Sequence, residues 1–221
     1  RGVRLGILIP ELYKMQVRAL VHALLEVRKL GHDPKPEVMI PLVATQRELL
    51  YLRETLEEEI RRTFKGTGQN ENIPIGTMIE TPRAAITAER LGVYADFFSF
   101  GTNDLTQLTW AFSRDDVESS FLPRYLDLEL VPFNPFESLD QAGVGILVKT
   151  ATDQARSIRK DFKLGVCGEH GGDPSSIHFF DQIGLDYVSC SPFRVPVARL
   201  ESGRAVAMKA NAKSAKESST Q

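Results

Sequence analysis

Two kinds of apolar pattern alternate along the chain. Short, nearly continuous apolar runs are typical of strands that are buried on both faces. Longer stretches with an apolar residue every three or four positions are typical of amphipathic helices. Each strand pattern precedes a helical one, which predicts βα units with parallel strands. The predicted strands cover residues 38–43, 75–79, 97–100, 164–166 and 187–190, and the predicted helices cover residues 10–30, 46–64, 82–91, 105–112, 140–160, 174–183 and 196 onward.

This alternation predicts an α/β fold with a parallel sheet. A complete (β/α)8 TIM barrel takes about 250 residues, whereas this chain has 221. We therefore expect a partial (β/α)8 barrel that consists of the later strands and helices. A doubly wound open sheet is the alternative, although the chain lacks the Gly-x-Gly-x-x-Gly sequence of a dinucleotide site.

The barrel domain is predicted to cover residues 1–204 and to be incomplete at its N-terminal side. Residues 205–221 are rich in Ala, Lys, Ser and Glu, which predicts a frayed helix end or a disordered tail. The chain starts at Arg1 and not at a methionine, so we expect it to be part of a longer polypeptide. The apolar residues 5–9 form either a strand or the entry to a helix.

The longest stretch without a regular apolar pattern covers residues 113–136. It is polar and is interrupted by several prolines, so the sequence predicts a long loop there. Long loops in compact domains are often functional. We expect this segment to act as a lid over a site.

Composition and charge exclude several classes of function. A formal net charge of −2 gives no polycationic surface, which argues against nucleic acid or an anionic membrane as the main partner. No apolar run approaches the roughly 20 residues of a membrane span. The two cysteines, Cys167 and Cys190, lack the spacing of a zinc site or a disulfide framework. We therefore expect a soluble protein in a reducing compartment.

Polar residues that can bind a cation or an anion follow two of the predicted strands. Glu80 and Asp104 each come directly after a strand, and the catalytic residues of βα barrels gather at these carboxyl ends. With Asn103 nearby, they offer the oxygen ligands that Mg²⁺ prefers. Gly101 lets the backbone approach a ligand, and the amides of Thr102 and Asn103 can hold an anion. The alternative is that these residues are helix caps, salt-bridge partners and a plain helix-start turn.

Cys167 is a candidate proton donor at a third strand end. An ordinary thiol has a pKa of ~8.5 and is protonated at pH 7, while a carboxylic acid is ionised there. A thiol at this strand end can therefore give a proton to a carbanion or an enolate. Glu169 is a candidate to orient the thiol. A buried inert thiol is the alternative for Cys167 and for Cys190. His170 and His178 are expected to be surface or core residues and not ligands.

Three polar stretches follow predicted strands: Ile79-Glu80-Thr81-Pro82, Gly101-Thr102-Asn103-Asp104-Leu105-Thr106-Gln107 and Cys167-Gly168-Glu169-His170-Gly171-Gly172-Asp173-Pro174. Together they resemble the phosphoenolpyruvate (PEP)-utilising enzymes, and the similarity runs from Arg1 to about Leu200. The third stretch, together with residues 189–196, is similar to the pyruvate, phosphate dikinase branch. PEP synthase and enzyme I of the sugar phosphotransferase system share Gly-Thr-Asn-Asp-Leu but differ after the Cys-Gly pair, and they remain alternatives.

The resemblance implies an enzyme that interconverts pyruvate, ATP and phosphate with PEP, AMP and pyrophosphate. It implies a phosphohistidine carrier on a swivelling domain, a Mg²⁺-stabilised enolate, a homodimer and a cytoplasmic location, with a plastid or another organelle as the alternative. By the same resemblance, Cys167 is the acid and base at the substrate methyl carbon. Glu80 and Asp104 are the implied Mg²⁺ ligands, and Glu80, Gly101, Thr102, Asn103 and Asp104 are the implied substrate contacts.

The chain departs from the family pattern in one important respect. The carrier histidine, the nucleotide-binding domain and the early barrel strands with their phosphate-binding arginines do not occur in it. We therefore expect that the isolated chain cannot complete the overall reaction and binds PEP weakly, because charge-assisted contacts are missing. The alternative of another class is a non-catalytic barrel fragment that serves as a dimerisation or interaction module. None of the four histidines of the chain sits in the carrier motif of the family. They are His22, His32, His170 and His178.

Overall fold

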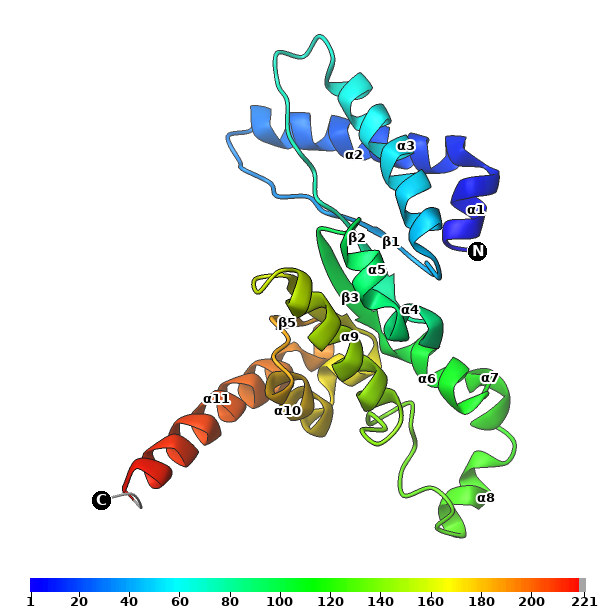
Figure 1. Ribbon diagram of the computed structural model, residues 1–221, viewed down its shortest axis with the longest axis vertical. Helices are drawn as coiled ribbons and strands as arrows, with labels where there is room; N and C mark the ends of the chain where they lie inside the picture. The colour runs from blue at the N-terminus through cyan, green and yellow to red at the C-terminus, as the bar shows by residue number, and fades with distance from the viewer. Residues whose placement is uncertain (219–221) are drawn as a thin grey trace. The chain divides into compact units, whose positions relative to one another are not determined.

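Strands and helices alternate along the chain, as the apolar patterns predict (Figure 1). The computed structural model describes residues 1–218, and the side chains of residues 1–211. Strand order in the sheet follows the order in the sequence, β1-β2-β3-β4-β5. This order is that of a βα barrel, whereas a doubly wound sheet reverses its order at a switch point. The strands are β1 (Val38–Ile40), β2 (Ile75–Ile79), β3 (Phe97–Gly101), β4 (Lys163–Cys167) and β5 (Tyr187–Val188).

The chain forms two compact units. The first comprises residues 1–99 and 154–162, and the second comprises residues 100–153 and 163 onward. Strand β3 and helix α9 (Val144–Ile158) each contribute residues to both units. The predicted division at residue 204 stays a prediction.

The first unit begins with two helices, α1 (Val3–Leu8) and α2 (Pro10–Lys29). The helical alternative for residues 5–9 is therefore confirmed, and the strand is wrong. The N–H of Val3 donates to the carbonyl of Pro41 at 3.0 Å, which fixes the start of α1 beside the end of β1. Pro10 stands in the first turn of α2, where a missing N–H costs nothing.

Helix α3 (Gln46–Phe64) starts at a capping box. The hydroxyl of Thr45 accepts from the N–H of Glu48 at 3.2 Å, and the Glu48 carboxylate accepts from the N–H of Thr45 at 2.8 Å. In Figure 1, α3 lies beside α2. Arg18 on α2 donates to the buried carboxylate of Glu59 on α3 at 2.8 Å, so the buried charge is paired. The core of α3 consists of Leu49, Leu52, Leu56, Ile60 and Phe64.

The βα units of the first unit follow the predicted positions with two local differences. Strand β1 pairs in parallel with β2, Val38 opposite Ile75, but it ends at Ile40 and not at residue 43. The reason is that Pro41 has no N–H and Leu42 has a left-handed φ of 57°. The predicted helix 82–91 is two helices, α4 (Pro82–Ile86) and α5 (Ala88–Gly92), that meet at Thr87.

In the second unit, β4 and β5 pair in parallel with Gly165 opposite Tyr187. A Cβ at Gly165 would lie 2.0 Å from the Tyr187 ring, so only glycine allows this ring to cross the strand. His178 on α10 contacts Glu201 on α11 at 2.8 Å. The helices of this unit are α6 (Thr102–Trp110), α7 (Arg114–Val117), α8 (Leu122–Asp127), α10 (Pro174–Gln182) and α11 (Val195–Ser218), with short 3₁₀ helices η1 (Glu169–Gly172) and η2 (Pro192–Arg194).

The prediction of an irregular loop over residues 113–136 is wrong. This segment contains α7 and α8 and has a small core of its own, in which Phe136 is fully buried. The ring centroids of Phe112 and Phe121 are 5.3 Å apart, and those of Phe121 and Tyr125 are 4.8 Å apart. Clustered aromatic rings bury enough apolar surface to order a segment without helical periodicity. The core residues are Val117, Leu122, Val131 and Phe136.

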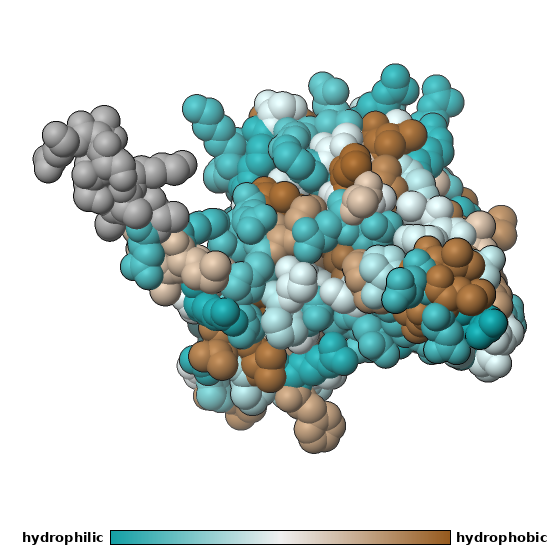
Figure 2. All heavy atoms as spheres, turned by 90° about the horizontal axis from the view of Figure 1, so that it is seen from below, coloured by the Kyte–Doolittle hydropathy of each residue, from teal (hydrophilic) through white to brown (hydrophobic). Residues whose placement is uncertain are grey.

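The surface mixes polar and apolar side chains. On the face shown in Figure 2, hydrophilic side chains predominate and hydrophobic ones form separate patches. Among the helices that the structure describes, none combines the length and the apolar character of a membrane span.

Candidate functional site

The turn after β3 presents backbone donors at the start of a helix. Gly101 ends the strand and is the N-cap of the nine-residue helix α6, with no side-chain cap. Thr102, Asn103 and Asp104 form the first turn of this helix. The first N–H groups of a helix have no intrahelical partner and lie at the positive end of its dipole. This turn can therefore receive an anionic group.

The turn after β4 lies against the turn after β3. Cys167 is the last residue of β4, and its Sγ donates to the carbonyl of Phe100 at 3.6 Å. Gly168 follows with a φ of 117°. A Cβ on Gly168 would lie 3.0 Å from Thr102 Oγ1 and 3.1 Å from Asn103 Oδ1. Both the backbone conformation and the close approach therefore require glycine at position 168.

The side chain of Asn103 is oriented by the segment that follows Cys167. The N–H of Glu169 donates to Asn103 Oδ1 at 3.3 Å. Since a backbone N–H can only donate, the oxygen of the amide faces Glu169. The NH₂ group of Asn103 therefore points away from Glu169, where it can donate to an anionic ligand.

His170 is a core residue, as the sequence predicts, and it has two polar partners. Its Nδ1 lies 2.7 Å from Thr102 Oγ1, and its Nε2 lies 2.9 Å from the carbonyl oxygen of Pro135. Burial lowers the pKa of His170 below its ordinary 6.5, although the Pro135 carbonyl and Asp173 oppose this shift. The imidazole is therefore neutral at pH 7.

Asp104 is oriented by its own helix. Its Oδ1 accepts from Gln107 Nε2 at 3.0 Å, and Gln107 Oε1 accepts from the N–H of Arg114 at 3.0 Å. Gln107 thus connects the first turn of α6 to the start of α7. This contact fixes one oxygen of the carboxylate through a neutral donor.

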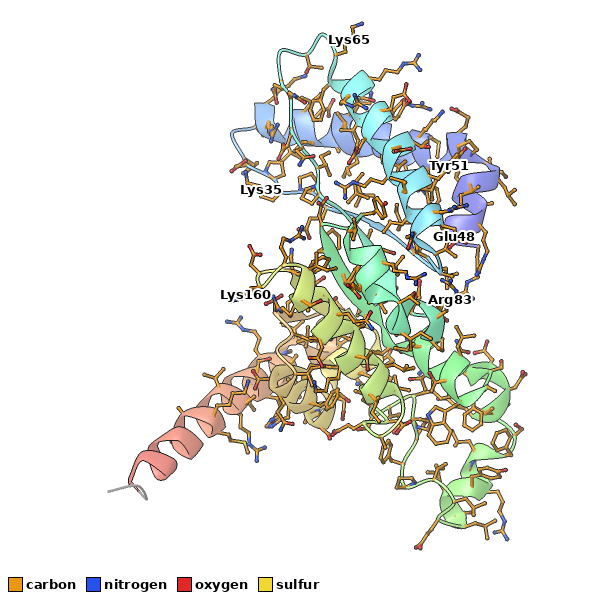
Figure 3. All side chains as sticks on the ribbon, viewed as in Figure 1. Lys35, Glu48, Tyr51, Lys65, Arg83 and Lys160 are labelled. Carbon is orange, nitrogen blue, oxygen red and sulfur yellow. The ribbon has the colours of Figure 1, made fainter. Side chains whose placement is uncertain are left out.

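Glu80 lies in the first unit, directly after β2, and is almost fully buried. Its Oε1 accepts from the N–H of Leu42 at 2.5 Å, and Leu42 is the residue with the left-handed φ. Ala44, two residues further on, makes two hydrogen bonds. Its carbonyl accepts from Arg83, and its N–H donates to the carboxylate of Glu48. Figure 3 labels Glu48 at the start of α3 and Arg83 on α4. The loop after β1 is therefore fixed where it meets Glu80.

The donor set fits a hard cation such as Mg²⁺. Glu80 and Asp104 are carboxylates whose orientation is fixed by neutral N–H donors, as is usual for carboxylate ligands of metals. Within the described residues, no group of three or more His, Cys, Asp and Glu side chains is arranged to hold a metal ion. Mg²⁺ commonly takes only one or two protein carboxylates and completes its shell with water and substrate.

The structure brings most of the predicted site residues together within the second unit. Thr102 Oγ1 lies 3.4 Å from the carbonyl oxygen of Cys167, and the N–H of Glu169 contacts Asn103 as described above. Glu80 belongs to the first unit, and its convergence with the other residues stays a prediction. Glu169 contacts Asn103 through its backbone, and its role in orienting the thiol also stays a prediction.

A pocket of about 400 Å³ opens beside the turn after β4. Its walls include Glu169, Phe136, Arg114 and Arg194. Arg194 donates to the carbonyl of Glu169 at 3.3 Å and packs on Gly172, where a Cβ would lie 2.3 Å from its side chain. Two arginines give this pocket a positive character that suits a ligand with carboxylate or phosphate oxygens.

Sequence reasoning missed the contributions of Gln107, Arg114, Arg194 and His170. Gln107 and Arg194 stand inside stretches that carry the family resemblance, and this was the available signal. Arg114 gives no such signal, because it begins a segment that the sequence predicts as a loop. His170 was correctly predicted as a core or surface residue, but its partners are 35 and 68 residues away in the sequence.

Comparison with known proteins identifies similar chains. Residues 1–206 match the family model for the PEP-binding domain of PEP-utilising enzymes. The chain is 52% identical over 206 residues to the chloroplastic pyruvate, phosphate dikinase of Mesembryanthemum crystallinum, which is 93% of this chain and 22% of that protein. It is 52% identical over 200 residues to pyruvate, phosphate dikinase 2 of Zea mays, which is 90% of this chain and 22% of that protein. The chain therefore spans about a fifth of the length of these relatives.

A solved structure shares the fold. A citrate lyase from Burkholderia xenovorans LB400 matches with a TM-score of 0.55 and 14% sequence identity, over 86% of this chain and 53% of that one. At this identity the likeness concerns the fold alone. The predicted α/β fold with parallel strands, part of a βα barrel, is confirmed.

Proposed function

Since this chain belongs to the PEP-utilising enzymes, through their PEP-binding domain, we propose that it binds PEP and pyruvate as part of a pyruvate, phosphate dikinase. Its own step is the exchange of a proton at the substrate methyl carbon. The contact between the turn of Cys167 and the start of α6 supports this function most directly. It sets a thiol beside donors for an anion, which is what the protonation of an enolate requires.

The residues of the second unit have distinct parts in this step. The N–H groups at the start of α6 and the NH₂ of Asn103 bind the anionic oxygens of the substrate. Cys167 gives its proton to the methylene carbon when pyruvate forms, and takes a proton from the methyl group in the other direction. In its protonated form the thiol can donate to the carbonyl of Phe100, whose oxygen lies 3.6 Å from Sγ.

Glu80 and Asp104 are the residues that would hold Mg²⁺. When bound, this ion offsets negative charge on the oxygens of the substrate. The N–H of Leu42 and the side chain of Gln107 hold the two carboxylates in place for that purpose.

The complete dikinase reaction needs parts that this chain does not supply. The phosphohistidine and nucleotide domains would carry the phosphoryl group from ATP, and the chain alone would be inactive in the overall reaction. The names of the relatives support a dikinase over PEP synthase and enzyme I. The word chloroplastic in one of them supports a plastid as the alternative to the cytoplasm.

Apolar side chains at the end of the second unit support a homodimer. Phe193 of η2 is 94% exposed, and Val197 and Leu200 of α11 are also exposed. Exposed apolar residues in one region are typical of protein interfaces. The same observation favours a second candidate function, a non-catalytic interaction module.

A chimeric enzyme, called the graft below, tests the proposed function. Residues 1–206 replace the matching segment of the Mesembryanthemum crystallinum dikinase, and PEP formation from pyruvate, ATP and phosphate is measured. We expect turnover with release of pyrophosphate by the graft and none by the 221-residue chain alone. A folded graft without turnover or proton exchange at pyruvate contradicts the enzyme and favours the interaction module. Release of phosphate in place of pyrophosphate would favour PEP synthase, and turnover by the chain alone contradicts its dependence on other domains.

A further inference from the structure

His170 is a buried polar residue that the proposed function does not use. The side chains of His170 and Thr102 are both completely buried. Each ring nitrogen has a partner at hydrogen-bonding distance, Thr102 Oγ1 for Nδ1 and the carbonyl of Pro135 for Nε2. The imidazole therefore connects the first residue of α6 with the end of the 113–136 segment.

The partners determine where the protons lie. The carbonyl oxygen of Pro135 can only accept, so Nε2 must carry a hydrogen. A neutral imidazole with its hydrogen on Nε2 has a lone pair on Nδ1. The 2.7 Å contact between Nδ1 and Thr102 Oγ1 then requires the hydroxyl to be the donor.

This assignment restricts what Thr102 can do. A hydroxyl has one proton, so Thr102 cannot donate to His170 and to the carbonyl of Cys167, 3.4 Å away, at the same time. With its proton engaged and its side chain buried, the hydroxyl cannot donate to an anionic ligand. Any contact of Thr102 with such a ligand is left to its backbone N–H at the start of α6.

We propose that His170 is a positioning residue for substrate binding. By accepting the hydroxyl proton of Thr102, it fixes the start of α6 so that the backbone N–H groups of Thr102 and Asn103 receive the anionic substrate. This inference rests on the proposed function, since PEP or pyruvate is the ligand. His170 itself does not touch the substrate.

The groups around His170, taken together with its burial, favour the neutral imidazole. Asp173 and Glu169 act to raise its pKa, whereas Arg114 and, more strongly, burial act to lower it. Protonation would turn Nδ1 into a donor toward Thr102 and release the hydroxyl proton toward the carbonyl of Cys167. The arrangement at the start of α6 therefore depends on an uncharged His170.

Two substitutions in the graft separate the two contacts of His170. In His170→Asn the amide reaches the position of Nδ1 and can still accept from Thr102, while the Pro135 contact is lost. In His170→Gln the amide reaches the position of Nε2, so the Pro135 contact is kept and the acceptor for Thr102 is lost. We expect His170→Gln to raise KM for pyruvate about tenfold and His170→Asn to stay within about threefold of the unsubstituted graft.

The KM and Tm values of the two variants distinguish a positioning role of His170 from a purely structural one. Thermal unfolding of both variants is measured alongside KM, because a purely structural role would lower Tm and leave KM unchanged. Equal changes of KM in the two variants, or a larger change in His170→Asn, would overturn the proposal.

A spectroscopic measurement tests the proton assignment without any activity. In the 221-residue chain with ¹⁵N-labelled histidine, we expect His170, assigned by its loss in His170→Gln, to show a proton on Nε2 and none on Nδ1 at pH 7. A proton on Nδ1 would overturn the inference. An inactive unsubstituted graft would contradict the proposed function and not the proton assignment, so the two failures are distinguishable.

Discussion

The Sγ of Cys167 lies 3.6 Å from the carbonyl oxygen of Phe100. Activated cysteine nucleophiles have a neighbouring imidazole or another group that takes their proton. His170 follows closely in the sequence, but its two nitrogens contact Thr102 and Pro135. The proposed role of Cys167, as an acid and a base toward carbon, therefore does not rest on activation by His170.

Replacing Cys167 tests this role. In the graft, Cys167→Ala should abolish proton exchange between the pyruvate methyl group and solvent, because the proton donor is lost, while the half-reaction with ATP continues. Exchange is followed by NMR in deuterated water. Cys190→Ala is the matched control, since Cys190 lies in the same unit and borders a pocket whose lining includes none of the predicted site residues. Exchange that persists in Cys167→Ala would remove the thiol from the mechanism.

Replacing the carboxylates tests the metal site. Glu80→Gln and Asp104→Asn keep side-chain shape and an oxygen acceptor but remove the charge that a hard cation needs. In the graft, each change should raise the Mg²⁺ concentration for half-maximal activity about 10- to 100-fold. Glu54→Gln, at an exposed position of α3, is the control and should leave it unchanged. An unaltered Mg²⁺ requirement in Glu80→Gln would leave Glu80 as a structural acceptor for Leu42.

The residues at the strand ends could be predicted from the sequence because their positions depend on local patterns. An apolar run that stops at Gly101 or Cys167 predicts where a strand ends, and parallel strands end on the same side. The role of His170 depends on Pro135, which approaches it only in the folded chain. No local pattern encodes such a partner, so the contact could not be predicted.

At the scale of elements, helix starts are specified by short polar signals. Thr45 and Glu48 form the capping box that begins α3. Thr45→Ala removes the acceptor for the N–H of Glu48 and should destabilise the first unit by about 1 kcal/mol. Chemical denaturation of the chain, followed by circular dichroism, measures this change.

A second threonine of the same helix provides the control. Thr55 lies inside α3, and its hydroxyl donates to the carbonyl of Tyr51. Thr55→Ala should be neutral or slightly stabilising, because alanine has the higher helix propensity. Equal losses in both variants would show that the cap itself contributes nothing.

The 113–136 segment shows why a structured region was mistaken for a loop. Its helices have only four and six residues, too short for a 3.6-residue period to appear. Its order comes from aromatic contacts between residues such as Phe112 and Phe121, which lie on different elements and do not repeat with a helical period. The longer helices, by contrast, were predicted correctly because their apolar faces repeat over several turns.

Phe136 should hold this segment together. Its ring is fully buried, so Phe136→Ala is expected to cost about 3 to 5 kcal/mol of local stability. Phe133 is 38% exposed, and Phe133→Ala should cost less than about 1 kcal/mol. Hydrogen exchange of residues 114–127 measures both. Unchanged protection in Phe136→Ala would show that the aromatic cluster does not order the segment.

At the scale of the whole molecule, the strand order was the most predictable feature. Repeated βα signals predict consecutive parallel strands, and the structure has this order. The division into two units was not predicted, because it falls inside β3 and α9, where the apolar patterns are continuous. An apolar pattern predicts local structure. It does not predict how many contacts form between segments that are distant in the sequence.

The buried His170 makes the stability of the folded chain depend on pH. In the unfolded chain its pKa is about 6.5, and in the folded chain burial lowers it. Below about pH 6.5 the unfolded chain therefore binds a proton that the folded chain does not. The free energy of unfolding should fall as the pH decreases through this range, by at most about 1.4 kcal/mol per pH unit from this group. Above about pH 7.5 the contribution of His170 no longer depends on pH.

Trp110 makes this dependence measurable in the second unit. It is the single tryptophan of the chain and lies on α6, in the same unit as His170. Urea denaturation followed by its fluorescence, at several pH values between about 5 and 8, should show a smaller loss of stability toward acid pH in His170→Gln than in the unsubstituted chain. His32→Gln, at an exposed position, should keep the original slope. Identical slopes for the unsubstituted chain and His170→Gln would mean that His170 takes up its proton equally in the folded and unfolded chains, which is incompatible with a neutral imidazole between Pro135 and Thr102.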